Sequence, residues 1–375
     1  MIPSDHSAFL RFPCLRGLWL GLLCAGLALP PATSAQPLGA RGEDFLYQVR
    51  AGDTLEQLAR RYTLQASHWS TLQRLNQVAD PYALRIGRVL RIPLALIPER
   101  PAEADVVHMA GAVTLDGRPL RAGGALEDGQ TLRSAAGGTA TLRLEDRSLL
   151  TVAPATELRI EHLRAFQGTG LTDTVLDVRQ GSIETIVAPG DTGVGRFEVR
   201  TPATVTGVRG TRLRIHADAA GSRHEILQGR GAVSGGATRA EQHIEVNQGM
   251  AYDAAGAFRG ARPLLPAPML PAPEDVGADG TLDFPAILGA VGYRVRIARD
   301  ADGALLAHDQ RAAAPPIRLP ALGGGPYHVF VRGIDDLGIE GRDAAITLRL
   351  RASLTSADGL PVLSSDGTPV ALQVF

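Results

Sequence analysis

Lysine is absent from this sequence of 375 residues, so its 38 basic residues other than histidine are all arginines. The arginines are dispersed and never form a run, and the formal net charge is only -1. A chain with so little net charge has no general field to attract nucleic acid or an anionic membrane surface. We therefore expect no nucleic-acid partner. Although the guanidinium fork suits carboxylate and phosphate, we attribute the dispersed arginines to a composition bias.

Cysteine is nearly absent as well, and its two copies lie close to the N-terminus. In that segment Arg11 and Arg16 precede the short apolar run GLWLGLLCAGLAL, and ATSA offers a cleavage site after Ala35. This pattern is typical of an export signal, with a retained membrane anchor as the competing interpretation. Lipidation at Cys24 is disfavoured because a leucine precedes it. We expect a signal peptide over residues 1–35, cleaved near Ala35, and a periplasmic mature protein.

The mature chain would lack Cys14 and Cys24, which excludes disulfides, thiolate zinc sites and cysteine nucleophiles. No later stretch reaches about 18 apolar residues, so we expect no membrane span in the mature chain. The histidines show no pair at the spacing of a helical metal site, and no Gly-x-Ser-x-Gly elbow occurs. GDTGVG at 190–195 lacks the Lys and Ser/Thr of a phosphate loop. We expect no cofactor, no metal site and no enzymatic activity.

Two proline-rich segments divide the mature sequence: IPLALIPERPAEAD at 92–105 and RPLLPAPMLPAPEDVG at 262–277. Such segments act as semi-rigid spacers. The expected fold class is multidomain and mainly β, with a small βααβ unit, a β-rich domain and a β-sandwich. The expected boundaries are 1–35 for the signal peptide, 45–93 for the βααβ unit, 94–105 for a linker, 106–260 for the β-rich domain, 261–280 for a Pro-rich linker, 281–350 for the sandwich and 351–375 for a C-terminal tail.

The βααβ unit is read from YQVRAGDTLEQLARRY and the residues that follow it. Tyr47 and Val49 alternate as a short strand, and Gly52 turns the chain. Asp53 is expected to cap a helix, with Glu56 as its capping-box partner. Helical spacing predicts a buried face made of Leu55, Leu58, Ala59 and Tyr62. A second helix from about Ser67 is expected to turn Trp69, Leu72 and Leu75 inward, and LRIGRVLRIP returns as a strand.

This string resembles a LysM (lysin-motif) domain over residues 47–93, through its aromatic-x-Val start, Gly-Asp-Thr-Leu, later Asn and final Gly-x-x-Leu-x-Ile-Pro. The resemblance implies two helices packed on a two-stranded sheet. It also implies a groove between two loops for glycans that contain N-acetylglucosamine, such as peptidoglycan. Backbone amides and a hydroxyl can meet the polar groups of a sugar there, and apolar side chains its C–H face. The implied glycan-binding residues are Gly52, Asp53, Thr54, Leu55, Pro81, Tyr82, Leu84 and Ile86.

A second interpretation of these residues is structural. Gly52, Asp53 and Thr54 also suit a turn and a helix cap, and Leu84 and Ile86 suit a core. A single copy of such a domain is expected to bind weakly, because repeats supply avidity.

From residue 106 short alternating strands predict an antiparallel sheet system, rolled or sandwiched. In RFEVR, Phe197 and Val199 point one way and the charged residues the other; TRLRIH repeats this with Leu213 and Ile215 inward. The segment resembles a FecR-type domain. It shares GQTLRSAAGGTATLRLEDRSLLTVAP, VRQGSIETIV and FEVRTPATVTGVRGTRLRI, and the matching positions are Asp146, Gly181, Thr201, Pro202, Gly210 and Thr211.

Members of the FecR family are known as periplasmic portions of sigma-factor regulators. They also carry a cytoplasmic anti-sigma segment and a membrane helix, and neither is recognisable here. The resemblance therefore favours an exported β domain that serves as a scaffold or an interaction surface.

The last domain contains two hairpin-like pairs, GYRVRIARDADGALLAHD and YHVFVRGIDDLGIEG. Tyr293, Val295 and Ile297 are expected inward, with Arg294 and Arg296 outward. The layout resembles a fibronectin type III-like sandwich, which implies a spacer or a protein-binding surface. Two Asp-Gly turns in residues 351–375 indicate a terminal hairpin or a loose tail.

These expectations combine into a non-catalytic protein of the cell envelope. The LysM-like unit would bind peptidoglycan, and the two β domains would present surfaces to a protein partner in the envelope. One alternative is a periplasmic sensor or regulator of an envelope signalling system. Another is an accessory to a cell-wall hydrolase, or a cryptic hydrolase.

Overall fold

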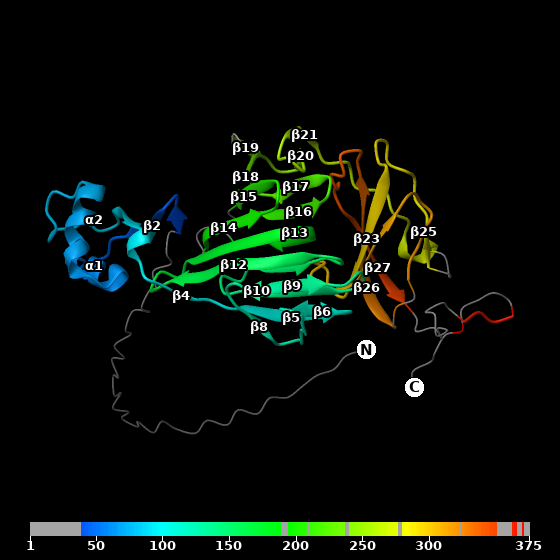
Figure 1. The fold of residues 1–375 in the computed structure, drawn as a ribbon, viewed down its shortest axis with the longest axis horizontal. Coiled ribbons are helices and arrows are strands. Elements are labelled where there is room, and N and C mark those ends of the chain that lie inside the picture. Colours follow the sequence, from blue (N-terminus) through cyan, green and yellow to red (C-terminus); the bar gives the residue numbers. More distant parts are fainter. Residues whose placement is uncertain are drawn as a thin grey trace, which may run out of the picture. The chain divides into compact units, whose positions relative to one another are not determined.

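The structure is a computed structural model that describes residues 39–188, 194–208, 210–236, 240–276, 280–320, 322, 324–350, 362–365 and 370. The signal peptide expected at 1–35, most of GDTGVG and most of the tail at 351–375 lie outside the described residues. Strands dominate the described part, and helices occur mainly near its N-terminal end (Figure 1). Among the described helices, none has the length and apolar character needed to cross a membrane.

The N-terminal unit contains the expected βααβ order, preceded by an additional strand, so its sheet has three strands instead of the expected two. Its elements are β1 (Ala40–Arg41), β2 (Asp44–Gln48), α1 (Leu55–Thr63), the 3₁₀ turn η1 (Ala66–His68), α2 (Trp69–Asn76) and β3 (Val89–Pro93). Strand β2 pairs antiparallel with both β1 and β3. Helix α1 forms because its apolar residues share one face, and this face is buried against the sheet. Phe166 and Leu171 of the next domain complete this core.

Two details of the helices differ from expectation. The cap of α1 is Thr54 and its capping-box partner is Gln57, one residue beyond the predicted pair of Asp53 and Glu56. The predicted cap fails because the Asp53 carboxylate accepts hydrogen bonds from Tyr47 and Arg50. Helix α2 begins at Trp69, after a 3₁₀ turn. Of the three residues predicted to face inward, only Leu72 is buried, whereas Trp69 is 37% exposed and Leu75 is half-buried.

In the described residues of the central domain, eighteen strands form one hydrogen-bonded sheet system. They are β4 (Glu99–Pro101), β5 (Ala104–Ala110), β6 (Val113–Leu115), β7 (Arg118–Pro119), β8 (Ala125–Leu126), β9 (Thr131–Ser134), β10 (Thr139–Leu144), β11 (Leu149–Val152), β12 (Glu157–Phe166), β13 (Thr172–Ile186), β14 (Val194–Arg200), β15 (Thr204–Val208), β16 (Arg212–Asp218), β17 (Gly221–Gln228), β18 (Gly231–Gly235), β19 (Glu241–Ile244), β20 (Gln248–Asp253) and β21 (Phe258–Pro263). The segment expected as a linker at 94–105 holds the 3₁₀ turn η2 (Leu94–Leu96), β4 and the start of β5.

Strand β13 connects the two parts of this domain. Its first half pairs with β12 and, in parallel, with β14, whereas its second half pairs with β11 and β16. The change of partners falls at Gly181, whose φ is +93°. A Cβ on this glycine would lie 2.3 Å from the Thr156 Oγ1 atom. Glycine is therefore required for the strand to pass between the two parts.

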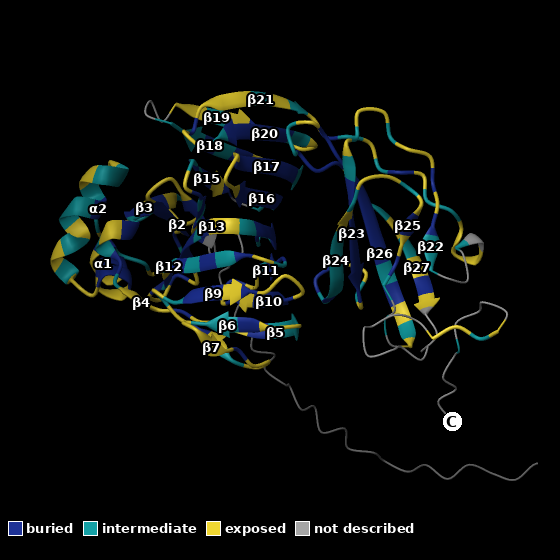
Figure 2. Cartoon of the chain, turned by 45° about the vertical axis from the view of Figure 1, so that its right-hand side comes forward, coloured by how far each residue is buried: buried dark blue, intermediate teal, exposed yellow. Residues whose placement is uncertain are grey.

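One hydrophobic core serves both parts of the central domain, and strand alternation explains it. Phe197, Val199, Leu213 and Ile215 are buried there, as the sequence predicts. Figure 2 shows β16, β17 and β20 largely in the colour of buried residues. Both faces of these strands are thus covered in places, since Arg214 between Leu213 and Ile215 is also buried.

The last domain consists of two small sheets. Their strands are β22 (Thr281–Leu282), β23 (Gly292–Ala298), β24 (Leu306–Ala312), β25 (Ile317–Arg318), β26 (Gly325–Ile334) and β27 (Ala344–Leu350), and the 3₁₀ turn η3 (Pro273–Asp275) precedes them. The order in the larger sheet is β24-β23-β26-β27, and β22 pairs with β25. Tyr293, Val295 and Ile297 are buried in a common core, as predicted.

The prediction that Arg294 and Arg296 face outward is wrong. Both are buried, with 6% and 4% of their surface exposed. They lie on the face of β23 opposite the core of their own domain, and that face contacts the central domain. There Arg294 donates a hydrogen bond to Ser182 and Arg296 to Glu184.

Candidate functional site

The first predicted glycan-binding loop is a tight turn between β2 and α1. Gly52 has φ +86°, which L side chains rarely adopt. The Asp53 Oδ2 atom accepts hydrogen bonds from the Tyr47 hydroxyl at 2.8 Å and from the Arg50 amide at 2.7 Å. Burial, this hydrogen bond and the charge of Asp53 raise the pKa of Tyr47 to about 12. The turn is thus held rigid by its own polar groups.

Thr54 caps α1 with its side chain. Its Oγ1 atom accepts a hydrogen bond from the Gln57 amide at 3.3 Å, and the Gln57 Oε1 atom accepts one from the Thr54 amide at 3.2 Å. The hydroxyl hydrogen of Thr54 is not used by the cap and can be donated to another acceptor. Leu55 is fully buried in the core, so only its backbone lies at the loop.

The second predicted loop lies beside the first, because the Leu55 amide donates a hydrogen bond to the Pro81 carbonyl at 3.3 Å. The Tyr82 amide is held by Asp80 Oδ1 at 2.9 Å. The side chains of Tyr82 and Ile86 are 77% and 67% exposed. Leu84 is half-buried and packs on the core of the unit. The structure therefore brings the two loops together and exposes two of their large apolar side chains.

A second cluster, which sequence reasoning missed, joins β13 and β16 of the central domain to the last domain. Its centre is Glu184 on β13. Its Oε2 atom accepts from Arg296 Nη1 at 2.5 Å, and its Oε1 atom from Arg212 Nη2 at 2.8 Å. Arg214 and Arg332 lie at 3.5 Å from its carboxylate. Burial alone would raise the pKa of Glu184, but these arginines outweigh it and hold the pKa well below its usual range.

Glu340 is the second acidic centre of this cluster. It accepts hydrogen bonds from Arg294 Nη1 at 2.9 Å and from Arg332 Nε at 2.5 Å. Arg294 also holds both oxygens of Asp309, each at 2.8 Å, and reaches Ser182 Oγ at 3.1 Å. Burial opposes the charge on Arg294, yet the two carboxylates raise its pKa above the usual value. Arg294 thus uses its Nε, Nη1 and Nη2 donors together, in a planar arrangement that the ammonium group of a lysine could not reproduce.

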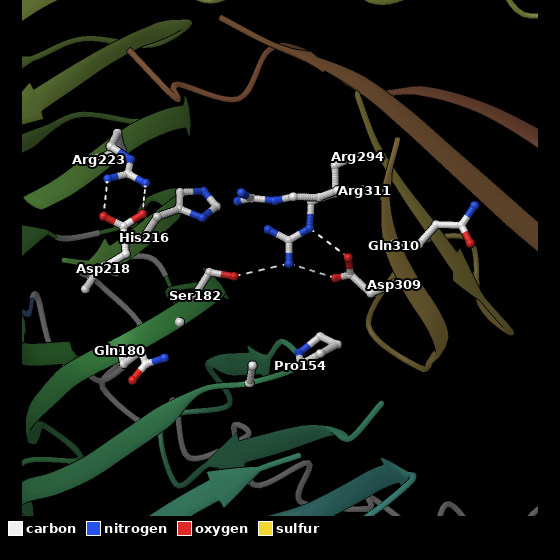
Figure 3. Close-up of a pocket in the computed structure, with 13 residues that line it drawn as sticks. Pro154, Gln180, Ser182, His216, Asp218, Arg223, Arg294, Asp309, Gln310 and Arg311 are labelled. Atoms are coloured by element: carbon white, nitrogen blue, oxygen red, sulfur yellow. Dashed lines mark hydrogen bonds and ion pairs between the residues drawn. The ribbon is translucent and has the colours of Figure 1, made fainter. Parts of the chain in front are cut away.

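A pocket of about 300 Å³ opens at the edge of this cluster, beside the point where β13 passes Gly181. Figure 3 shows side chains from three places in the chain converging on it: Ser182 from β13, His216 with Asp218 from β16, and Arg294 with Asp309 from the last domain. Asp218 is held by both terminal nitrogens of Arg223. The pocket is therefore polar, and most of its charges are already paired.

One signal in the sequence could have indicated this cluster. Charged residues alternate with core residues in RLRI of β16, SIETI of β13 and YRVRI of β23. A charged face is normally solvated, so alternation predicts the face but does not show that two such faces meet. The described residues contain no group of three or more His, Cys, Asp and Glu side chains that could hold a metal ion.

Solved structures that share features with this chain include two crystal structures of a protein assigned as an anti-sigma factor from Parabacteroides distasonis. They are 12% and 13% identical, with TM-scores of 0.29 and 0.30. The match covers 36% of this chain and 59% of each solved chain. The extracellular domain of a hybrid two-component system from B. thetaiotaomicron is 8% identical over 71% of this chain and 60% of its own, with a TM-score of 0.15. At these TM-scores the likeness carries no conclusion about function.

No curated protein matches the chain. Two family models do match. Residues 47–93 match the LysM domain, and residues 130–230 match the FecR protein. Neither match reaches residues 281–350, so the fibronectin type III-like assignment stays a prediction. The chain therefore carries a LysM domain followed by a FecR-type domain.

Proposed function

We propose that this protein is a non-catalytic, exported component of the bacterial envelope that binds peptidoglycan glycan through its LysM domain. The observation that carries the proposal is the pair of adjoining loops in the matched segment, where Tyr82 and Ile86 are exposed next to the rigid turn at Gly52. Both side chains belong to the second loop, so this loop offers apolar surface to a ligand. A sugar ring can cover them with its C–H face.

The polar part of the site comes from the first loop. The Thr54 hydroxyl can donate to an N-acetyl carbonyl, and the Oδ1 atom of Asp53 can accept from a sugar hydroxyl. Because the turn is already held by Tyr47 and Arg50, little ordering entropy is lost on binding. Binding through one shallow site should be weak and reversible.

The test is sedimentation of the full mature chain with purified sacculi. We expect Tyr82→Ala and Ile86→Ser each to weaken binding roughly three- to tenfold, because each removes apolar contact with the sugar. Leu288→Ala is the control, since Leu288 is an apolar residue of the last domain that is 97% exposed and lies outside the LysM loops. Point variants are preferable to truncation, because the LysM core includes Phe166 and Leu171. Equal sedimentation of all variants would refute the proposed site.

A second candidate function is favoured by the FecR match at residues 130–230. In this proposal the protein is a periplasmic sensor that passes a signal to a separate membrane partner, and the β domains supply the contact surface. Co-purification with an inner-membrane regulator supports it. An accessory role in cell-wall hydrolysis would instead require release of muropeptides from sacculi by the protein.

A further inference from the structure

We propose that the pocket beside Gly181 binds the terminal carboxylate of a short peptide, and that Arg311 is the residue that receives this carboxylate. The pocket lies between the FecR-type domain and the last domain, outside the LysM loops. It is therefore a second binding site, independent of glycan binding.

The balance of charge around the pocket selects a single negative charge. Of its lining residues, Asp218 is paired with Arg223, and Asp309 with Arg294. Arg311 is the remaining cation of the lining. It lies 3.6 Å from Glu340, whose oxygens already receive Arg294 and Arg332. A monoanionic carboxylate of a ligand would give Arg311 an acceptor that it does not share with other arginines. A dianionic phosphate would instead be repelled by the neighbouring acidic side chains.

A buried histidine at the pocket wall supplies the second observation. His216 lines the pocket and is only 4% exposed, and neither ring nitrogen forms a hydrogen bond within the described part of the chain. Its Nε2 atom faces the carboxylates of Glu225 and Glu340, at 3.2 Å and 3.7 Å. The Nδ1 atom has neither a hydrogen bond nor an ionic partner among the described residues. A buried polar atom of this kind is costly, so a ligand group that reaches Nδ1 would remove that cost. Figure 3 shows the imidazole on the same side of the pocket as Asp218 and Arg223.

The size and the remaining lining fit a peptide. Gln180 and Gln310 carry amides, and Pro154 and Ala155 provide a small apolar wall. About 300 Å³ is at the lower limit for a small-molecule site and accommodates about two small amino-acid residues. A second hollow of about 470 Å³ shares Gln180 and Asp218 with the pocket, so a longer peptide could continue there.

The experiment is calorimetric titration of the full mature chain with N-acetyl-alanyl-alanine, its C-terminal amide and inorganic phosphate. We expect the free acid to bind with a dissociation constant of about 1 mM or lower, and the amide and phosphate to bind at least about tenfold more weakly. Arg311→Gln should weaken the binding of the free acid by a similar factor. The side chain of Arg311 is 60% exposed, so this substitution leaves the fold intact.

Arg318→Gln is the matched control, because Arg318 is an exposed arginine of the same domain that does not line the pocket. It should bind the acid as the unaltered chain does. Absence of measurable binding would overturn the inference, and so would equal binding of acid and amide or an unchanged affinity in Arg311→Gln. Since the probe contains no sugar, none of these outcomes bears on the LysM proposal.

Discussion

At the scale of single residues, His224 shows how this chain buries a polar group. Its Nε2 and Nδ1 atoms lie 2.9 Å from the hydroxyls of Thr204 and Thr206, and its ring stacks edge-on against Tyr252. Burial, with further contributions from His216 and Arg223, lowers the pKa of His224 to about 3. The folded protein therefore keeps this imidazole neutral at any pH near physiological values.

This pKa has a measurable consequence for stability. Below a pKa of about 6.5, which is that of histidine in the unfolded chain, the unfolded chain binds a proton at His224 and the folded chain does not. The free energy of unfolding therefore decreases by about 1 kcal/mol for each pH unit below this value. Urea denaturation at pH 7.5, 6.5 and 5.5 measures this slope. His224→Gln should remove that part of the slope, whereas His243→Gln, at an exposed position, should not. An unchanged slope in His224→Gln would contradict the assignment.

Residues also mark the limit of what the sequence predicts. The pattern correctly places Val295 and Ile297 in a core, because burying apolar side chains away from water stabilises the folded state. It also indicates which face Arg294 and Arg296 take. It does not show that another domain covers this face, since that depends on partners more than 100 residues away in the sequence, such as Glu184.

At the scale of elements, β13 carries the architecture of the central domain. The resemblance to FecR-type domains includes Gly181 among its matching positions. The exchange of partners from β12 and β14 to β11 and β16 was not recognisable in the sequence, because pairing partners are set by packing and not by local sequence. The helix cap in the LysM domain is a similar case: Asp53 and Thr54 both suit the position, and only the contacts of Tyr47 and Arg50 decide between them.

Gly181→Ala tests the role of this glycine. We expect a loss of roughly 3 kcal/mol or more in the free energy of unfolding, because the substitution combines a strained φ with a clash against Thr156. Gly207→Ala in β15 is the control, since a Cβ there meets nothing within 4 Å, and it should change stability by less than about 1 kcal/mol. Chemical denaturation measures both. A small loss in Gly181→Ala would mean that β13 can bend without a glycine.

The candidate glycan site was predictable only in part. The motif locates both loops, and their hydrogen bond confirms that they adjoin. Tyr82, Leu84 and Ile86 look alike in the sequence, yet the first and last are exposed and Leu84 is half-buried. Periodicity does not separate them because the loop has no regular repeat.

At the scale of the whole molecule, the FecR-type domain and the last domain are joined by buried ion pairs centred on Glu184 and Glu340. Removing one partner of such a group leaves an uncompensated charge in the interior, which is far more costly than losing a surface pair. The absence of lysine, which on sequence grounds we attribute to a composition bias, has a structural counterpart here. The single side chain of Arg294 donates hydrogen bonds to Asp309, Glu340 and Ser182.

Glu184→Gln should therefore lower the free energy of unfolding by about 3–5 kcal/mol, since Arg296 and its neighbours would remain buried without their acceptor charge. Glu56→Gln removes an exposed pair with Arg60 on α1 and should cost no more than about 0.5 kcal/mol. Urea titration followed by circular dichroism compares the two. Equal effects of the two substitutions would show that water reaches the charges between the domains more freely than the structure indicates.

The placement of the charges also bears on how the chain can be divided. The proline-rich stretch before residue 281 invites a cut there, yet the two products would not be inert. One would carry Glu184 on a bare surface, and the other would carry Arg296 and Arg332 on the matching one. Fragments with complementary ionic surfaces of this kind are suited to reassembly, which is the property that split-protein reporters exploit.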